Sequence, residues 1–271
     1  MASSTSVIQG YLEPAVFMFL SSLFFIETAI TSPKLLFTNF TAFRDKAFGK
    51  WWLMVGKLAA ESTPKSLDNH IAKLRGVVLD VGPGAGTQLF RFKPNAENIT
   101  AVYAVEPNTL LHKSLAMRAE EAGLGGKYHI LTCGAESESL IPELQKAGLL
   151  KEAAIGASGT PIFDGVCCLL VLCTVPFPVE TIDGLYKLLK PGGRFTFCEH
   201  VVATTPVAKF LQKFYHFFGW KTLIGGCNMT RDTGKWLVDA ARGDGGWKEV
   251  NYEPVHPNIP LPWLVGTLVK R

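Results

Sequence analysis

Two acidic residues flank a glycine-rich turn in the first half of the chain. A run of apolar and β-branched residues ends at Asp80, and glycine then recurs at alternate positions, Gly82, Gly84 and Gly86. Glycine lets the backbone approach a ligand closely, and a carboxylate just before the turn suits a cationic amino group, which donates charge-assisted hydrogen bonds. Glu106, twenty residues beyond the last glycine, stands where a carboxylate can accept both hydroxyls of a ribose. The pattern predicts a site for a nucleoside that carries an amino acid tail.

The spacing of the glycines disfavours a dinucleotide. A GxGxxG loop that began at Gly82 would have its third glycine at the position of Thr87. A carboxylate at Asp80 would also repel a pyrophosphate group. An ordinary strand-to-helix turn stays open as the alternative, because a single glycine loop is weak evidence on its own.

Apolar runs alternate with helical segments from residue 76 onward, which predicts βαβ units around a mostly parallel sheet. The predicted strands span 76–81, 101–106, 128–132, 163–172 and 194–199, with final apolar runs at 247–252 and 263–270. The predicted helices span 108–122, 137–147 and 179–189, the last stopped by the sequence Pro-Gly-Gly at 191–193. We therefore expect a doubly wound, Rossmann-like α/β domain with a seven-stranded sheet over residues 61–271, interrupted by an aromatic insertion at about 205–229.

The region 1–60 differs from the rest of the chain. Residues 15–26 carry no charge, but twelve residues are short of the roughly 20 needed to cross a bilayer. Five basic residues between 31 and 60 are opposed only by Asp45, and the pair Trp51 and Trp52 lies among them. The pattern predicts a hydrophobic helix that anchors the protein in one leaflet, with the tryptophans against the headgroups, at the cytoplasmic face of a membrane such as the endoplasmic reticulum or a lipid droplet. A helix that caps the substrate pocket is the alternative.

Composition narrows the class of protein. The 271 residues are 48% hydrophobic and 18% charged, which is typical of a folded chain with a large core. The formal net charge of +4 is too small to indicate nucleic acid as a partner. The six cysteines show neither CxxC spacing nor a nearby histidine pair, so we expect free thiols and no metal site.

Further motifs follow the glycine loop in a characteristic order. They are Phe163–Val166 leading into Leu170–Val175, Leu189–Gly193 leading into Glu199–Val201, and Gly226–Asp232. With the loop, they resemble the class I S-adenosylmethionine-dependent methyltransferases, and among these the membrane-associated thiol methyltransferases related to the ubiquinone-biosynthesis type. The resemblance covers roughly residues 79–271. Departures at Cys133, at Gly234 and at residues 261–263 concern the acceptor substrate more than the cofactor.

The resemblance implies S-adenosylmethionine as the cofactor and assigns residues to it. Its methionine portion would lie against the glycine loop, its ribose against the carboxylate that follows the second strand, its adenine beyond the third strand, and its sulfonium above a floor formed after the fourth strand. The residues assigned to the methionine portion are Asp80, Gly82, Gly84 and Gly86, and those assigned to the ribose are Glu106 with the following Pro107 and Asn108. The residues assigned to the adenine are Ala135 and Glu136, and those assigned to the floor beneath the sulfonium are Leu172 and Cys173.

Methyl transfer from a sulfonium needs alignment and exclusion of water, and a base only as far as the acceptor retains its proton. Glu199 and His200 end the fifth strand, where ligands gather in open α/β sheets, and are the candidate catalytic residues; a structural role in bonding to backbone is the alternative. The aromatic residues between 210 and 220 would roof an apolar pocket, extend a membrane surface or form helix core. We expect methyl transfer to a small lipophilic thiol, hydroxyl or carboxyl acceptor; a non-methylating cyclisation or rearrangement, or binding only, is the alternative.

Overall fold

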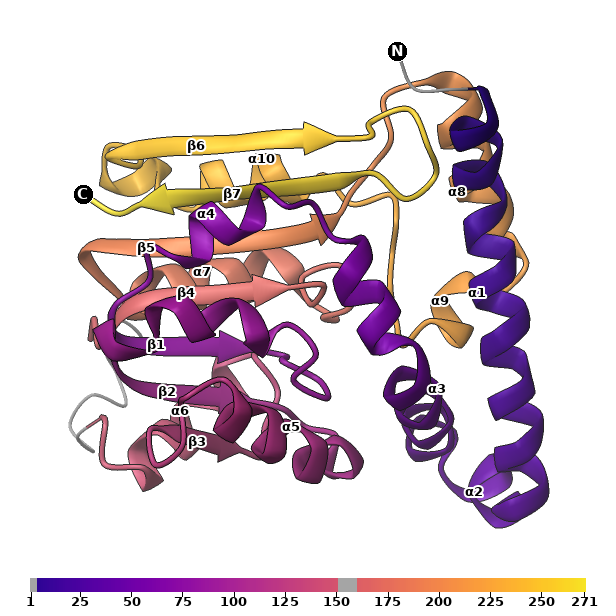
Figure 1. Cartoon of the computed structure of the whole chain (residues 1–271), viewed down its shortest axis with the longest axis horizontal. Helices are drawn as coiled ribbons and strands as arrows, with labels where there is room; N and C mark the ends of the chain where they lie inside the picture. Colours follow the sequence, from indigo (N-terminus) through magenta and orange to yellow (C-terminus); the bar gives the residue numbers. More distant parts are fainter. Residues whose placement is uncertain (1–3, 151–159) are drawn as a thin grey trace.

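A seven-stranded sheet forms the centre of the computed structural model, which describes residues 4–150 and 160–271. The strands follow the order β3-β2-β1-β4-β5-β7-β6, and all adjacent pairs are parallel except those that β7 makes with β5 and β6 (Figure 1). Their bounds are β1 Gly76–Val81, β2 Ile99–Val105, β3 Tyr128–Leu131, β4 Phe163–Leu169, β5 Leu189–His200, β6 Glu249–Val255 and β7 Trp263–Val269. The predicted doubly wound α/β sheet is confirmed.

Helices cover both faces of this sheet (Figure 1). One face packs against α6 (Ser137–Lys146), α7 (Pro178–Leu188) and α10 (Thr233–Asp239), and the other against α4 (Leu67–Ile71), the 3-10 helix η1 (Leu89–Asn98) and α5 (Thr109–Glu121). Successive side chains of a strand enter opposite cores, because the side-chain period of a strand is two. Cys167 and Cys168 show this on β4, and all six cysteines are buried and free.

The expected boundary before β5 is displaced. The strand begins at Leu189 rather than at residue 194, so Pro191, Gly192 and Gly193 lie inside it rather than between helix and strand. Leu189 pairs with Phe163 and Arg194 with Gly165, and the register shifts between these pairs. A local loop signal is overridden here by pairing with β4, as tertiary context often overrides propensity.

The N-terminal region forms three helices at the carboxyl ends of the strands: α1 (Ser4–Thr31), α2 (Pro33–Thr38) and α3 (Phe40–Ser62). In Figure 1, α3 lies between the sheet and α1. Helix α1 extends well beyond the uncharged run that predicted it, because Glu13 and Glu27 are accommodated within it; Glu27 pairs with Lys50 at 2.9 Å. Its residues Ile8–Thr31 are long and apolar enough to cross a membrane, which a count of uncharged residues alone did not indicate.

Helix α1 is fixed to the rest of the protein along its length. The Tyr215 hydroxyl donates to the Tyr11 carbonyl at 2.7 Å, and the buried Ser21 hydroxyl donates to the Leu223 carbonyl at 2.6 Å. The partners of these bonds belong to α8 (Pro206–Phe217) and α9 (Trp220–Leu223), which form most of the predicted aromatic insertion. The N-terminal region and the insertion therefore pack together over one edge of the sheet.

Candidate active site

The glycine loop follows β1 in a backbone conformation that favours glycine. Gly82, Gly84 and Gly86 have φ values of +61°, +59° and +76°, in the left-handed region. A Cβ atom at Gly82 would lie 2.4 Å from Cγ2 of Val171, and one at Gly84 would lie 2.7 Å from the indole nitrogen of Trp52. Both the conformation and the close neighbours therefore require glycine at these positions.

The two predicted carboxylates lie at the ends of β1 and β2. The Tyr128 hydroxyl donates to Asp80 at 2.7 Å, and the amides of Gly84 and Asn108 donate to Glu106 at 2.9 and 2.8 Å. Burial raises the pKa of Asp80 to about 7, because the hydrogen bond from Tyr128, which favours the ionised form, offsets only part of the desolvation. Burial likewise raises the pKa of Glu106, against its two amide hydrogen bonds. A cationic ligand group would satisfy the charge that burial disfavours at Asp80.

Glu199 fixes the loop that follows β4. Its carboxylate accepts hydrogen bonds from the amides of Val171, Leu172 and Cys173 at 3.0, 2.9 and 3.1 Å. Burial raises the pKa of Glu199 to about 8, although these three hydrogen bonds favour the ionised form. The side chain is fully buried and does not border the cavity described below. Its contacts are those of a residue that positions the loop.

Arg231 supports the same loop from the other side. Its guanidinium donates to the carbonyl of Leu172 and, at 2.7 Å, to that of Val175. Leu170 begins the loop with a φ of +64°, a conformation that is rare for a leucine and is maintained here by the surrounding contacts. The motif at residues 226–232 contains Arg231, but no local pattern singles this residue out, because its partners are carbonyls far along the chain.

His200 and Cys227 mark the opposite end of the site from the glycine loop. The His200 ring packs on Trp263 with 4.2 Å between ring centroids. The pKa of the Cys227 thiol lies well below its usual range because the side chain of Cys173 hydrogen-bonds to it, as does His200. Correspondingly, the pKa of Cys173 is raised by its hydrogen bond with Cys227. A thiol and an imidazole therefore lie together among aromatic side chains.

The N-terminal helices close the site on the side away from the sheet. Trp51 of α3 is only 2% exposed, and its ring meets that of Phe17 on α1 edge to face, with 6.0 Å between centroids. The prediction that Trp51 rests against lipid headgroups is therefore wrong, because the ring is enclosed by protein. Glu13 and Phe17 of α1 both border the site. The sequence offered no periodic signal for their orientation within an apolar segment.

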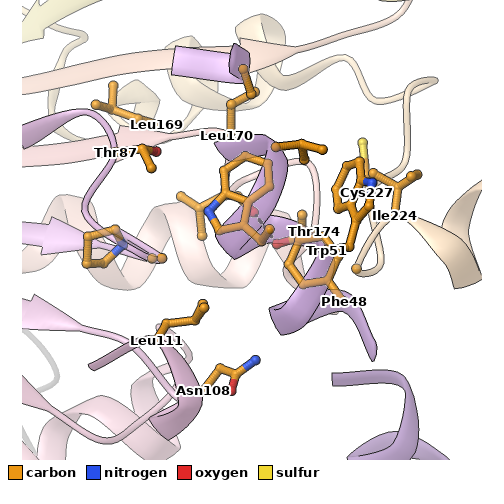
Figure 2. Close-up of a pocket in the computed structure, with 18 of the residues that line it drawn as sticks. Phe48, Trp51, Thr87, Asn108, Leu111, Leu169, Leu170, Thr174, Ile224 and Cys227 are labelled. Carbon is orange, nitrogen blue, oxygen red and sulfur yellow. Dashed lines mark hydrogen bonds between the residues drawn. The ribbon is translucent and has the colours of Figure 1, made fainter. Parts of the chain in front are cut away.

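These elements enclose a cavity of about 700 Å³. Figure 2 shows Asn108 and Leu111 toward one end of it, and Trp51 beside Ile224 and Cys227 toward the other. The volume lies in the range of small-molecule and cofactor sites. We call the part beside the glycine loop the cofactor end and the part beside His200 and Cys227 the acceptor end.

The cavity gathers most of the residues predicted from the sequence. Those that border it are Asp80, Gly82, Gly84, Gly86, Glu106, Pro107, Asn108, Cys173 and His200. Those outside its lining are Ala135, Glu136, Leu172 and Glu199. Leu172 is fully buried in the core, and Glu136 precedes the first turn of α6. Among the described residues, no cluster of three or more His, Cys, Asp or Glu side chains is arranged to hold a metal ion.

Comparison with known proteins defines the class. A methyltransferase domain family matches residues 55–241, and the chain belongs to this family. The chain is an S-adenosylmethionine-dependent methyltransferase, as its motifs predicted. It is 28% identical over 210 residues to the thiol S-methyltransferase TMT1B of Mus musculus, covering 75% of this chain and 74% of the relative. With the thiol S-methyltransferase TMT1A of Homo sapiens, it is 28% identical over 187 residues, covering 69% of this chain and 65% of the relative.

Solved structures share the fold. An O-methyltransferase family protein from Burkholderia thailandensis has a TM-score of 0.56 at 14% identity, covering 100% of this chain and 74% of that one. The [4+2]-cyclase SpnF has a TM-score of 0.51 at 14% identity, covering 81% of this chain and 82% of that one. At such identities the likeness concerns the fold alone.

Proposed function

We propose that this methyltransferase acts on a small lipophilic thiol, with a hydroxyl or carboxyl acceptor as the next choice. The observation that carries the proposal is the contrast within one cavity, between two buried carboxylates at the cofactor end and an aromatic acceptor end. Trp51, Trp220 and Phe17 line the acceptor end and would exclude water from it. Relatives named as thiol S-methyltransferases support sulfur as the first acceptor atom to test.

The residues at the cofactor end fit S-adenosylmethionine. Asp80 would receive its amino group, because a buried carboxylate with a raised pKa gains most from a cationic partner. Glu106 would accept the ribose hydroxyls with the lone pairs that its two amide bonds leave free. Gly82 and Gly84 both border the cavity and would hold the methionine portion along the turn that their left-handed conformations form. We assign the adenine to the side of Ala135 and Glu136.

When bound, the cofactor supplies a methyl group on a sulfonium, which is already a strong electrophile. The protein's part is then to align the acceptor and to hold its proton. Of the two candidate catalytic residues, His200 borders the cavity and Glu199 does not, so we assign proton acceptance to His200 and positioning of the loop to Glu199. Cys173 belongs to that loop and borders the cavity, so it would form the floor beneath the sulfonium, whereas Leu172, predicted for the same role, is buried behind it in the core.

We also propose that α1 lies in the plane of a membrane and does not cross it. Its outward face carries a continuous apolar stripe at helical spacing, formed by Ile8, Leu12, Val16, Phe19, Leu23, Ile26 and Ile30. On the other side, the Tyr11 carbonyl and the buried Ser21 hydroxyl hydrogen-bond to α8 and α9, and the exposed Glu27 pairs with Lys50 of α3. A spanning helix would have to give up these contacts. One helix would thus serve as both anchor and cap.

Helix α8 bonds to α1 through Tyr215 and carries exposed aromatic residues of its own. Phe210, Phe214 and Phe218, whose i, i+4 spacing allowed an interpretation as helix core, are exposed, so that interpretation is wrong. Phe217 is exposed as well. Exposed aromatic side chains beside an exposed apolar helix face are typical of a surface that meets lipid. The cytoplasmic face of the endoplasmic reticulum or a lipid droplet remains our predicted location, and six free cysteines suit a reducing compartment.

Calorimetric titration with S-adenosylmethionine, followed by assay of S-adenosylhomocysteine release, tests the proposed activity. We expect binding to the purified protein and release of product with apolar thiols from a panel that includes matched alcohols and carboxylic acids. Binding without product from any member of the panel would favour a non-methylating cyclisation or rearrangement, or a binding role. Absence of binding would contradict the cofactor site itself.

A further inference from the structure

The inward face of α1 places one carboxylate in the cavity. Glu13 lies on the helix face that carries Gly10 and Phe17, it is partly buried, and it borders the cavity. Among the described residues, no hydrogen-bond donor reaches its carboxylate. Burial of an unpartnered carboxylate is unfavourable. A role in stabilising α1 therefore does not explain why a glutamate stands at position 13.

His200 borders the same cavity as Glu13. Burial raises the pKa of Glu13, while the charges of His200 and His256 lower it. The packing of α1 agrees with this, because a Cβ at Gly10, on the same helix face as Glu13, would lie 2.9 Å from Ile259, in the connection that carries His256. Glu13 and His200 form no direct ion pair, although both border the cavity. The His200 ring packs on Trp263, and Cys227 borders the same cavity. The acceptor end therefore contains an imidazole packed on Trp263 and a carboxylate that has no hydrogen-bond partner among the described residues.

We propose that Glu13 is a positioning residue for the transfer reaction, whose negative charge stabilises the protonated form of His200. The inference rests on the proposed function and assigns α1 a part in the chemistry. In the step, the acceptor S–H gives its proton to the His200 imidazole. The acceptor sulfur forms a bond to the methyl carbon while the bond from that carbon to the sulfonium breaks, leaving its electron pair on the cofactor sulfur. The products are a thioether, neutral S-adenosylhomocysteine and an imidazolium beside Glu13.

Other charged and titratable groups surround the pair. The titratable groups around Glu13 and His200 are His256, in the connection between β6 and β7, and Cys227, in the segment after α9. Glu199 is next to His200 in the chain, but its buried carboxylate accepts hydrogen bonds from the loop amides. Arg44, Asp45 and Lys46 of α3 border the same cavity. Glu13 is the carboxylate among these that borders the acceptor end and has no amide partner.

Glu13→Gln tests the proposal because it removes the charge and keeps the shape. With an alkanethiol acceptor, we expect kcat to fall about tenfold and the acidic limb of its pH profile to move about one unit lower, since the imidazolium loses a neighbouring charge. With thiophenol, which is already ionised at neutral pH, the loss should be much smaller. The affinity for S-adenosylmethionine should not change. Glu27→Gln, on the same helix but paired with Lys50, is the matched control and should behave as the unmodified protein.

A measurement without turnover separates this proposal from the proposed function. We expect the pKa of His200, followed by NMR, to be lower in Glu13→Gln than in the unmodified protein, whether or not either thiol is methylated. An unmoved His200 titration would overturn the role of Glu13 even if methyl transfer is observed. Equal losses with both thiols and an unmoved pH profile would also overturn it, because they would indicate a structural defect. Failure of the unmodified protein to methylate either thiol would contradict the proposed function. In that case the His200 titration alone would decide whether Glu13 stabilises the protonated form of His200.

Discussion

The cofactor end and the acceptor end of the cavity are assembled from different kinds of sequence. At the cofactor end, the chemistry comes from β1, β2 and the turns that directly follow them, within residues 80–108. At the acceptor end, Glu13, Trp51, His200 and Cys227 come from four segments that are far apart in the chain. The first end depends on local backbone conformation, and the second depends on how helices pack. Substitutions at the two ends should therefore fail in different ways.

The largest expected effect is at the glycine loop. Gly82→Ala would place a Cβ 2.4 Å from Val171 in a left-handed conformation, and we expect the affinity for S-adenosylmethionine to fall at least about 100-fold in calorimetry. Gly126→Ala is the matched control, because it has a similar φ of +71° but no atom within 4 Å of the added Cβ. Equal affinities for the two variants would show that the cofactor end tolerates a shift of its backbone.

Asp80→Asn tests the charge at the same end. We expect about 30-fold weaker cofactor binding at pH 8, from the loss of a charge-assisted hydrogen bond. With a pKa of about 7, Asp80 is mostly protonated at pH 6 and mostly ionised at pH 8, so affinity in the unmodified protein should rise about tenfold between these values. The variant should lose this pH dependence.

The same substitution should have the opposite effect on the stability of the ligand-free protein, which it should increase. Because the folded pKa of Asp80 lies above the unfolded value of 3.8, its contribution to stability is fully present below that value and is lost as the pH rises through about 7. Asp80→Asn should therefore raise the melting temperature of the ligand-free protein at pH 8. A lower melting temperature would mean that Asp80 is stabilised by contacts other than those described.

The outward face of α1 should affect membrane binding without affecting the cofactor end. Replacing both Phe19 and Ile26 by glutamate should reduce co-flotation with anionic phospholipid vesicles about tenfold, because it removes apolar contact area and adds charge repulsion. Val250→Glu on the edge strand β6, also exposed, is the matched control. Unchanged flotation of the double variant would place the lipid contact elsewhere, with the exposed phenylalanines of α8 the next to replace.

The smallest expected effect is at Cys227. Serine retains a hydrogen-bonding group beside His200, and Trp263 still holds the imidazole ring. We expect Cys227→Ser to change kcat by less than about threefold, measured as S-adenosylhomocysteine release. A loss of about 100-fold would assign the thiol a direct part in the reaction, and the acceptor end would then contain a nucleophile.

The contrast between the two ends explains what the sequence predicts well. The bounds of β1 are predicted to the residue, and Asp80 and Glu106 reach the cavity as expected, because each follows a buried strand that is recognisable by itself. Glu199 is predicted at the end of β5, but its orientation is not, since the amides that it bonds belong to a loop 26 to 28 residues earlier.

The N-terminal helices show what local patterns miss. The enclosure of Trp51 and the inward position of Glu13 depend on the packing of α1 and α3 against the strand ends. A count of apolar residues in a window contains no information on which face of a helix is covered. The sequence of this segment therefore indicates an anchor, whereas in the structure one face of α1 is exposed and the other borders the cavity.

Trp52 lies directly over Gly84 of the loop and stacks on Phe48 with 5.8 Å between ring centroids. In the proposed cofactor site, a methionine tail that reaches this loop would meet the indole, so its arrival should change the polarity around that ring. The fluorescence of this side chain thus provides an intrinsic optical signal of occupancy, and the substitution Trp52→Phe supplies the baseline from the other five tryptophans.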